Sequence, residues 1–373
     1  MAHISVCHIS TVHSVNDSRI FYKECQTLAK SDLKVNLVIN TDHSSIIDGV
    51  NVIALPNVKN RIFRMFVLSF IAFFKALRTR STIYHFHDPE LILIGFLFKL
   101  IGRKVIYDVH EDLREDILLK RWLGGRFITK VLASAASFAE KMADYFFDGI
   151  VAATPKIASH FNPNKTIILR NFVILSSFIN TTRIDKTKNK SDGSKLIYVG
   201  LLARIRGIKE IIEVMDQIKE NAELWLIGRW ENEKFREECE ALPGFRKTRY
   251  IGYVKHDEVP DYLRKADIGM VTLHPTKTFI ESYPIKVFEY MSSGLPVIMS
   301  DFLLWKELFD DAAVFVDPLN IDDIASKTDH LLSNKNISEA YAEKGQTLIL
   351  TKYNWEIESQ KLICLYGGLL NDK

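Results

Sequence analysis

Residues 281–301 read ESYPIKVFEYMSSGLPVIMSD and follow an apolar run, residues 268–272, that is typical of a buried strand. Pro284 is favoured in the first turn of a helix, where its missing N–H group would be unpaired anyway, and Gly294 favours a helix end. A second apolar run, residues 296–299, follows at once. A strand, a helix and a strand in this order are typical of a parallel sheet that is covered by helices.

The same alternation of short apolar runs and helical patterns extends in both directions along the chain. In the second half, the expected strands are residues 195–199, 223–227, 249–251, 268–272, 296–299 and 313–316. In the first half, they are residues 4–9, 35–39, 51–54, 83–86, 105–109, 149–152 and 166–169. Ligands of such sheets bind outside the carboxyl ends of the strands. We therefore expect an α/β protein with two Rossmann-like domains that face each other across a cleft.

A polar stretch between Phe172 and Ser194 predicts an exposed connector between the two series of strands. It separates an N-terminal domain, residues 1–180, from a C-terminal domain, residues 195–350. Residues 351–373 carry apolar side chains close to helical spacing, so we expect a helix that crosses back to the N-terminal domain. A length of 373 residues also favours two hydrophobic cores over one.

Composition and charge exclude several classes of protein. The chain is 47% hydrophobic and 25% charged, which is close to the average soluble globular protein and unlike a disordered or collagenous one. The net charge of +3 is too small for a nucleic-acid partner. Basic residues nevertheless outnumber acidic ones in residues 1–180, while the reverse holds in residues 181–373. This asymmetry favours contact of the first half with anionic lipid.

The cysteines and the N-terminus favour a cytoplasmic location, with a possible peripheral position on the inner face of the cell membrane. The four cysteines are far apart in the sequence, and no signal peptide pattern is visible. The apolar run 65–74 has about half of the roughly 20 residues that cross a bilayer. Residues 59–80 place aromatic side chains around a helix with basic ends. An interfacial helix that touches the membrane and a helix buried against the first sheet both remain open.

The stretch 281–289 carries groups that suit a bound diphosphate and sugar. The turn at residues 281–284 brings backbone N–H groups to a helix start, and Lys286 adds a cation in the first turn. Glu281 and Glu289 can each accept hydrogen bonds from sugar hydroxyls. The alternative is a solvated, capped helix. The candidate residues of this stretch are Glu281, Ser282, Tyr283, Pro284, Lys286 and Glu289.

A second phosphate-binding pattern follows the expected strand 195–199. Gly200 ends the strand, and Arg204 and Arg206 precede Gly207 and a helix. Two guanidinium groups therefore come to the carboxyl edge of the sheet, where they suit a diphosphate. The alternative is a pair of solvated surface arginines.

In the first half, His110 ends the expected strand 105–109 and is predicted to reach the cleft. There a neutral imidazole can contact a donor sugar or its phosphate, although His13, His85 and His87 compete for the same region. Asp112 is a candidate general base for an acceptor hydroxyl. Carboxylates at a helix start also complement the helix dipole, which is the alternative role of Asp112.

The stretch 281–301 resembles the E-x7-E donor-binding motif of glycosyltransferase family 4, a family of retaining enzymes with the GT-B fold. The similarity extends over nearly the whole chain, through the segments VHSVNDSRIFYKECQTLAK, KVIYDVHEDLRED and KLIYVGLLARIRGIKEI. In the same resemblance, His110 matches a cleft histidine and Arg206 a basic residue before a glycine. Tyr253 lies in a loop like the one beside the nucleotide base, whereas Leu201 replaces an arginine of the family.

The resemblance implies a retaining glycosyltransferase of the hexosyltransferase class. Its nucleoside diphosphate sugar donor would be held mainly by the C-terminal domain, and its hydroxyl acceptor mainly by the N-terminal domain. We expect the acceptor to be a polyprenyl-linked or other glycan of O-antigen, capsule or exopolysaccharide biosynthesis. The chain has no D-x-D sequence, so no metal and no cofactor is expected, the nucleotide sugar being a substrate. A GT-B sugar-nucleotide epimerase and a non-catalytic bilobed binding protein remain as alternatives.

Overall fold

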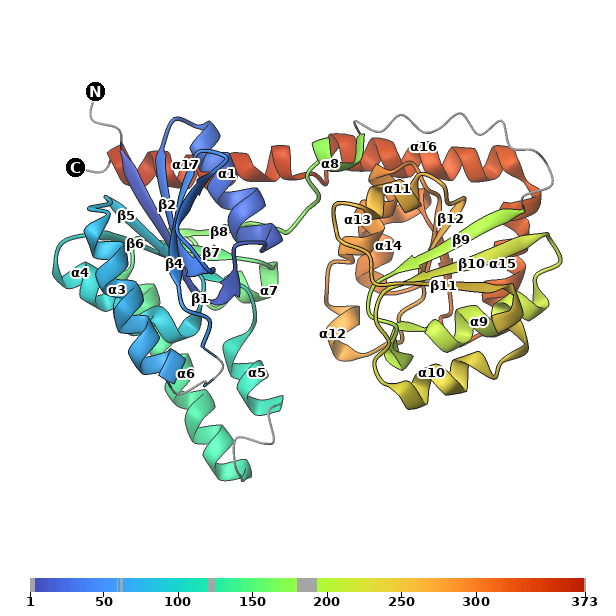
Figure 1. Ribbon diagram of the computed structural model, residues 1–373, viewed down its shortest axis with the longest axis horizontal. Helices are drawn as coiled ribbons and strands as arrows, with labels where there is room; N and C mark the ends of the chain where they lie inside the picture. Colours follow the sequence, from blue (N-terminus) through green and yellow to red (C-terminus); the bar gives the residue numbers. More distant parts are fainter. Residues whose placement is uncertain (1–3, 59, 61–62, 120–124, 180–192, 372–373) are drawn as a thin grey trace. The chain divides into compact units, whose positions relative to one another are not determined.

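The structure is a computed structural model that describes residues 4–58, 60, 63–119, 125–179 and 193–371. The chain divides into two compact units. The first unit comprises Met1–Asn171 together with Glu358–Lys373, and the second comprises Phe172–Ile357. Each unit has its own sheet of mostly parallel strands, which confirms the predicted α/β class (Figure 1).

The first unit is built on a sheet whose described strands run in the order β3-β4-β2-β1-β5-β6-β7-β8. Strand β3 pairs antiparallel with β4, and the other neighbours are parallel. The strands are β1 (Ser5–Ser14), β2 (Lys34–Asn40), β3 (Ser45–Ile47), β4 (Val50–Leu55), β5 (Ile83–Phe86), β6 (Lys104–Val109), β7 (Gly149–Ala152) and β8 (Thr166–Ile168). The chain order reverses between β1 and β5, which makes this the switch point of the sheet.

Helices cover both faces of the first sheet. A π-helical segment, Ser18–Cys25, continues into α1 (Gln26–Lys30), and a second one, Arg64–Leu68, continues into α3 (Ser69–Arg78). The other helices of this unit are α4 (Ile92–Leu100), α5 (Leu113–Leu119), α6 (Arg126–Phe146), α7 (Pro155–Ala158) and most of α17 (Trp355–Asn371). Helix α17 is the last element of the chain, and its residues from Glu358 onward belong to the first unit.

Side-chain alternation along the first sheet sorts apolar from polar residues. Cys7, Tyr84 and Tyr107 lie on the face that packs against α3, α4 and α6 in an apolar core. His8 and His85 are register partners on neighbouring strands and point to the opposite face. Buried polar groups on a strand need partners, so this second face is where the polar chemistry of the unit is concentrated.

The second unit is built on a parallel sheet with the strand order β11-β10-β9-β12-β13-β14. The strands are β9 (Ser194–Val199), β10 (Ala222–Ile227), β11 (Thr248–Gly252), β12 (Ile268–Val271), β13 (Val297–Ser300) and β14 (Val314–Val316). The helices are α8 (Ser176–Ile179), α9 (Ile208–Gln217), α10 (Glu233–Glu240), α11 (Val259–Leu263), α12 (Lys277–Ile280), α13 (Ile285–Ser292), α14 (Leu303–Phe309), α15 (Ile321–Ser333) and α16 (Lys335–Thr351). Here the switch point lies between β9 and β12.

The strands expected from the sequence are confirmed to within one residue at each end, except that β1 runs five residues further, to Ser14, and that one strand was missed. Strand β3 was not expected, because it is a three-residue edge strand with a serine and a tight turn beside it. The predicted exposed connector is wrong at its start: Phe172, Val173 and Phe178 are buried in the core of the second unit. The rest of that connector, residues 180–192, lies outside the described residues.

Residues 64–78 form the helix expected in the segment 59–80, while residues 59, 61 and 62 lie outside the described residues. Leu68, Ala72 and Ala76 are buried against the sheet, whereas Phe66 and Phe74 are more than half exposed. One face of this helix is therefore buried against the sheet, and its exposed face also carries apolar side chains. None of the helices in the described part of the chain has both the length and the apolar character needed to cross a membrane.

Candidate functional site

The candidate donor site lies at the switch point of the second sheet. Loops leave the carboxyl ends of β9 and β12 there, and the crevice that such loops form is the usual ligand site of open parallel sheets. The backbone N–H of His274, in the loop after β12, donates to the carbonyl of Ile205, in the loop after β9, over 2.9 Å. The two loops therefore meet in this structure.

Three residues predicted from the sequence come together at this point. Lys286 lies against Gly200, because a Cβ placed on Gly200 would be 3.0 Å from Lys286 Cε. The Nζ of Lys286 is 3.6 Å from Oε2 of Glu289, whose residue is 5% exposed. Helix α13 is held at the strand end because Tyr290 accepts a hydrogen bond of 2.7 Å from the Val199 N–H. The helix start, a cation and a buried carboxylate thus share one location.

His256 is a further member of this group that the sequence reading missed. Its Nε2 lies 3.3 Å from Oε1 of Glu289, on the other carboxylate oxygen from Lys286. It follows Tyr253 and Val254 in the loop after β11, so a polar residue in a loop at the carboxyl edge was the only available signal. Glu289 therefore lies between two groups that can carry positive charge.

The turn before α13 is anchored by a tryptophan. Trp305 Nε1 donates to the Ser282 carbonyl over 2.8 Å, and the ring of Tyr283 packs edge-on against Phe172. Pro284 is buried at the helix start. Glu281 follows α12 and is exposed, in contrast to Glu289. The two glutamates of the predicted motif therefore have different environments.

The predicted arginines also differ from one another. Arg204 pairs with Glu238 of α10, and its guanidinium lies 4.8 Å from the centre of the Phe235 ring. Arg206 lies 5.7 Å from the Phe279 ring, in the segment that leads to the turn before α13. Arg206 also opposes the effect of burial, which raises the pKa of the Tyr198 hydroxyl. Arg206 therefore contacts the segment just before α13, whereas Arg204 contacts α10.

Tyr253 lies beyond the carboxyl end of β11, as the sequence predicts. Its ring is 64% exposed and lies 4.6 Å from the guanidinium of Arg229, which follows β10. An exposed aromatic ring stacked under a cation offers a flat surface on which a nucleotide base can stack.

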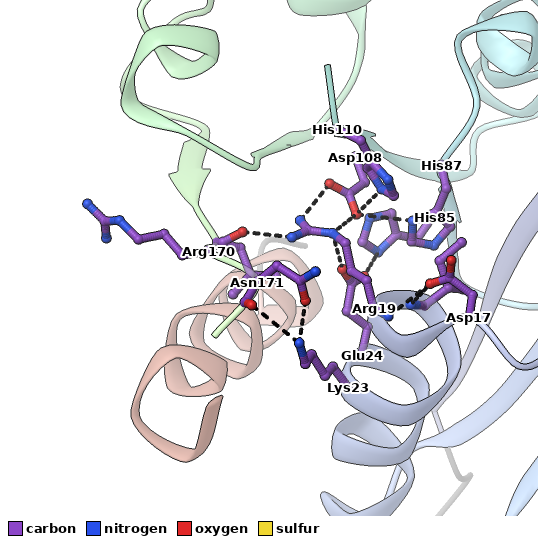
Figure 2. Close-up of polar contacts among 12 residues, drawn as sticks. Asp17, Arg19, Lys23, Glu24, His85, His87, Asp108, His110, Arg170 and Asn171 are labelled. Carbon is purple, nitrogen blue, oxygen red and sulfur yellow. Dashed lines mark hydrogen bonds and ion pairs between the residues drawn. The ribbon is translucent and has the colours of Figure 1, made fainter. Parts of the chain in front are cut away.

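The first unit holds a buried polar cluster at its own switch point (Figure 2). Asp108 Oδ1 accepts from Arg19 Nη2 over 2.9 Å, and its Oδ2 accepts from Arg19 Nε over 3.1 Å. Arg19 Nε also pairs with Glu24 over 3.1 Å. Burial alone would raise the pKa of Asp108, but Arg19 and the neighbouring histidines hold it well below its usual range. Burial and the charge of Asp108 raise the pKa of Glu24 well above its usual range.

His110 is attached to this cluster, as Figure 2 shows. Its Nε2 lies 2.9 Å from Asp108 Oδ2, and its side chain is 22% exposed, unlike the fully buried His85 and His87. His13 lies beside it, with ring centres 5.6 Å apart. The hydrogen bond that His13 donates to the Asp17 carboxylate raises the pKa of His13, against the effect of its partial burial. His110 is thus a partly exposed histidine that is hydrogen-bonded directly to Asp108.

Asp112 occupies the start of α5. Its Oδ1 accepts the N–H of Glu115 over 3.1 Å, which is the geometry of a helix cap. The alternative role that the sequence offered for Asp112 is therefore present in the structure. A capping carboxylate keeps a second oxygen for other contacts.

Two groups of described residues bring metal-ligating side chains within 4.8 Å of one another. One comprises His8, Glu24, His85 and His87, and the other His87, Asp108 and His110. Within the first, His8 Nδ1 and His87 Nε2 are 3.0 Å apart and form a hydrogen bond. The Tyr366 hydroxyl forms hydrogen bonds with His8 Nε2 and with His85 Nδ1. These four nitrogens are paired with one another or with Tyr366 in a hydrogen-bonded network, whereas His85 Nε2 has no hydrogen-bond partner within the described residues.

Exposed apolar side chains gather on the helices of the first unit. On residues 63–74 they are Phe63, Met65, Phe66, Val67, Phe70 and Phe74, and on α6 they are Phe127, Ile128, Val131, Leu132, Phe138, Tyr145 and Phe146. Helix α4 packs against both α3 and α6. Large exposed apolar areas mark interaction surfaces, for proteins or for lipid.

Two Rossmann-like units, each with polar residues at the switch point of its sheet, define the GT-B fold of glycosyltransferases. Sucrose-phosphate synthase from Thermosynechococcus elongatus shares this fold with 15% identity and a TM-score of 0.74, and each chain is covered completely. Anabaena HepE, crystallised in complex with UDP-glucose, has 12% identity and a TM-score of 0.72, with 98% of this chain and 100% of that chain covered. At these identities, the likeness shows the fold alone.

Similarity to known sequences is concentrated in the second half of the chain. Residues 180–348 match the family described as Glycosyl transferases group 1. An uncharacterized glycosyltransferase of Methanocaldococcus jannaschii is 25% identical over 182 residues, 48% of this chain and 45% of the relative. The O-antigen chain mannosyltransferase B of Escherichia coli is 25% identical over 166 residues, 43% and 42% of the two chains. This chain thus matches less than half the length of these relatives.

Proposed function

We propose that the protein is a retaining glycosyltransferase of family 4 that moves a sugar from a nucleoside diphosphate donor to a hydroxyl acceptor. The observation that carries this proposal is Glu289, a buried carboxylate between Lys286 and His256 at the switch point of the second sheet. Burying a charge is costly unless it serves a partner. A ligand that carries both hydroxyls and phosphates would use all three groups.

The diphosphate of the donor is assigned to the start of α13. The first-turn N–H groups of this helix and the Lys286 ammonium supply positive potential there, and Arg206 adds a guanidinium. Arg204 is assigned a lesser role because Glu238 already neutralises it. Charge that develops on a leaving diphosphate is stabilised by such fixed cations, so this arrangement lowers the barrier to transfer.

The hydroxyls of the donor are assigned to the two glutamates of the motif. Glu289 would accept hydrogen bonds from the ribose, and the exposed Glu281 would orient the transferred sugar. Ser282, Tyr283 and Pro284 shape the turn that joins these positions, and Tyr253 would stack on the base. One donor molecule would thereby contact the whole stretch from the turn to the middle of α13, as well as the loop after β11.

The reaction is proposed to occur on one face of the donor sugar, with retention of configuration. The bond between the anomeric carbon and the phosphate oxygen breaks, and the acceptor oxygen forms the new bond to that carbon. The departing phosphate oxygen takes the acceptor proton. Lys286 and Arg206 replace a metal in this scheme because they supply the neutralising charge. In the first unit, His110 is assigned to contact a substrate hydroxyl, and Asp112, the candidate base from the sequence, takes no proton in this scheme.

The acceptor is proposed to be a polyprenyl-linked or other glycan at the cytoplasmic face of the membrane. Exposed aromatic residues of the 63–74 segment lie between Arg64 near its start and Lys75 just after its end, a combination that suits an anionic lipid surface. The name of the Escherichia coli relative links it to O-antigen chains, which supports a polysaccharide pathway. The protein would then bind the membrane peripherally through its first unit.

The test is incubation of the purified protein with a set of nucleotide sugars, with and without a membrane lipid extract. Transfer of sugar to the extract, with retained anomeric configuration in the product, supports the proposal. Formation of an epimerised donor would identify an epimerase, and binding without turnover would identify a bilobed binding protein. Either of these two results would overturn the proposed transfer.

Two substitutions test the assigned residues in the same assay. Glu281→Ala and Lys286→Ala should each lower turnover while the thermal unfolding temperature is retained. Lys209→Ala is the matched control, because Lys209 forms a surface pair with Glu213 on α9. Turnover of Glu281→Ala and Lys286→Ala equal to that of the control would contradict both assignments.

A further inference from the structure

A chain of hydrogen bonds runs through the first unit, from the buried His85 by way of α17 to the partly exposed His110. It links, in order, His85, Tyr366, His8, His87, Asp108 and His110. All of these residues except His110 are buried. Tyr366 belongs to α17, whereas the others belong to β1, β5 and β6 or to the residue that follows each strand.

The charge of Asp108 fixes the direction of its two hydrogen bonds, those with His87 and His110. An ionised carboxylate can only accept hydrogen bonds, and Arg19 keeps Asp108 ionised. His87 Nδ1, 3.1 Å from Oδ2, and His110 Nε2, 2.9 Å from Oδ2, must therefore both carry hydrogens. Burial lowers the pKa of His87, so this ring is neutral and its Nε2 is a lone pair.

The remaining links follow from the first ones. His8 Nδ1 lies 3.0 Å from the His87 lone pair and must donate to it. Burial holds the pKa of His8 well below its usual range, so His8 Nε2 is in turn a lone pair. The Tyr366 hydroxyl, 3.1 Å away, donates to this lone pair and accepts from His85 Nδ1 over 2.8 Å. Each donor thus has one acceptor, and the chain has a single consistent direction.

The two ends of the chain differ in what they expose. At the inner end, His85 Nε2 is buried and has no hydrogen-bond partner within the described part of the chain. At the outer end, the neutral form of His110 has its hydrogen on Nε2, which leaves Nδ1 as the lone pair of a side chain that is 22% exposed. A metal ion among His8, Glu24, His85 and His87 would have to replace the His8–His87 hydrogen bond, so the geometry favours the hydrogen-bonded chain.

We propose that Tyr366 is a positioning residue that acts through His8, His87 and Asp108 to hold a neutral His110 with its Nδ1 lone pair toward substrate. A lone pair accepts a hydrogen bond from a hydroxyl and repels a phosphate oxygen. The substrate group that His110 contacts is therefore a sugar or acceptor hydroxyl, not the diphosphate. This last step rests on the proposed function, whereas the direction of the chain does not.

The first test reads the tautomers directly and needs no turnover. The protein labelled with ¹⁵N-histidine should show His8, His85 and His87 with hydrogen on Nδ1, and His110 with hydrogen on Nε2. Tyr366→Phe keeps the ring but removes the hydroxyl that bonds His8 and His85. The resonances of these two histidines should therefore shift. An Nε2–H tautomer at His87, a stoichiometric metal in the purified protein, or an unchanged spectrum in Tyr366→Phe would overturn the proposal.

The second test separates positioning from the docking of α17. Lys361→Met is the matched control, because Lys361 also ties α17 to the rest of the first unit, through a hydrogen bond of 3.3 Å to the Ile168 carbonyl. In the transfer assay, Tyr366→Phe should lower kcat by roughly 3- to 10-fold at unchanged donor KM, as expected for one hydrogen bond. Lys361→Met should keep kcat.

The outcomes of the second test are distinct from failure of the proposed function. Equal kcat values for Tyr366→Phe and Lys361→Met would overturn the positioning role. A raised donor KM at unchanged kcat in Tyr366→Phe would do the same, because it would show a loss of binding alone. If the wild type transfers no sugar, the proposed function fails, and the tautomer measurement still decides the direction of the chain.

Discussion

Gly228 and Gly200 lie in direct backbone contact at the carboxyl edge of the second sheet. A Cβ placed on Gly228 would be only 1.7 Å from the carbonyl oxygen of Gly200. Gly228 also has a φ of 145°, which side chains disfavour. The approach of these two residues brings together the loops after β9 and β10, and with them the donor site.

Replacement of Gly228 tests how strongly this approach holds the donor site. Gly228→Ala should lower the free energy of unfolding by about 2 kcal/mol or more, since backbone must move to relieve the clash. Gly367→Ala is the control, because a Cβ at Gly367 on α17 would meet nothing within 4 Å. Chemical denaturation measures both. Equal stabilities of the two variants would show that the loops rearrange without cost.

Glu289 is expected to contribute to nucleotide affinity through its charge. Glu289→Gln keeps the size of the side chain but cannot pair with Lys286 and His256 as an anion. We expect the Kd of UDP, GDP or TDP, whichever binds the wild type, to rise by about tenfold, as for the loss of a strong hydrogen bond. Titration calorimetry measures this. The control is Glu240→Gln, whose carboxylate pairs with Arg236 at the surface of α10. An unchanged Kd in Glu289→Gln would argue that this residue only supports the fold.

The two arginines of the loop after β9 are expected to differ in their effects. Arg206→Ala should weaken binding of the same nucleotide by about tenfold, because a cation that contacts phosphate is lost. Arg204→Ala should weaken it less, because Arg204 is engaged with Glu238 and Phe235. Parallel titrations of the two variants compare them. A larger effect at Arg204 would mean that its pairing with Glu238 breaks when the donor binds.

Glu140 on α6 predicts a pH dependence of stability. Burial raises the pKa of Glu140 to about 7, and the charge of Asp112 adds to this effect. Because the pKa in the folded state lies above that of the unfolded chain, the protonated carboxyl stabilises the fold fully below about pH 4.5. This contribution is lost as the pH rises through 7.

Glu140→Gln should remove this dependence. The variant and the wild type should have similar stabilities near pH 4.5, and the variant should be more stable at pH 8 by an amount of order 1–3 kcal/mol. Thermal unfolding at both pH values measures the difference. Glu339→Gln, at an ion-paired surface position on α16, should follow the wild type. A constant difference between Glu140→Gln and the wild type across this range would contradict the raised pKa.

The apolar face of residues 63–74 is expected to bind anionic membranes. The triple variant Phe66→Ser, Phe70→Ser and Phe74→Ser should lose flotation with vesicles of phosphatidylglycerol and phosphatidylethanolamine. These side chains are 58%, 41% and 57% exposed, so the fold should tolerate their loss. Leu303→Ser, at an exposed position in the second unit, is the control. If the triple variant floats as well as the control does, the membrane is contacted elsewhere or not at all.

Much of the fold was predictable because the parallel strands are short apolar runs bounded by polar residues. The runs at Ile83–Phe86 and Gly149–Ala152 coincide with β5 and β7. Strand β3 was missed because its stability comes from antiparallel pairing with β4, and neither its composition nor its length is distinctive. Phe172 was misplaced because a polar stretch follows it closely, although its own side chain packs in the second core.

The candidate donor site was predictable where a motif placed its residues on one element, as for Lys286 and Glu289. His256 was missed because its contact with Glu289 depends on how the loop after β11 folds over the sheet. The cluster around Asp108 was missed for a similar reason: Arg19 and Asp108 are 89 positions apart in the sequence. A single aspartate within the apolar run of β6 was the signal, since a buried charge on a strand requires a partner.

The bond between Tyr366 and His8 joins residues 358 positions apart. A ribosome that makes this chain therefore releases the first sheet long before the hydroxyl that completes its histidine row has been synthesised. The first sheet therefore stays incomplete, with polar groups unpaired, while the second unit is synthesised and can fold. The polar face of the first sheet would then be completed only after the second unit has been made.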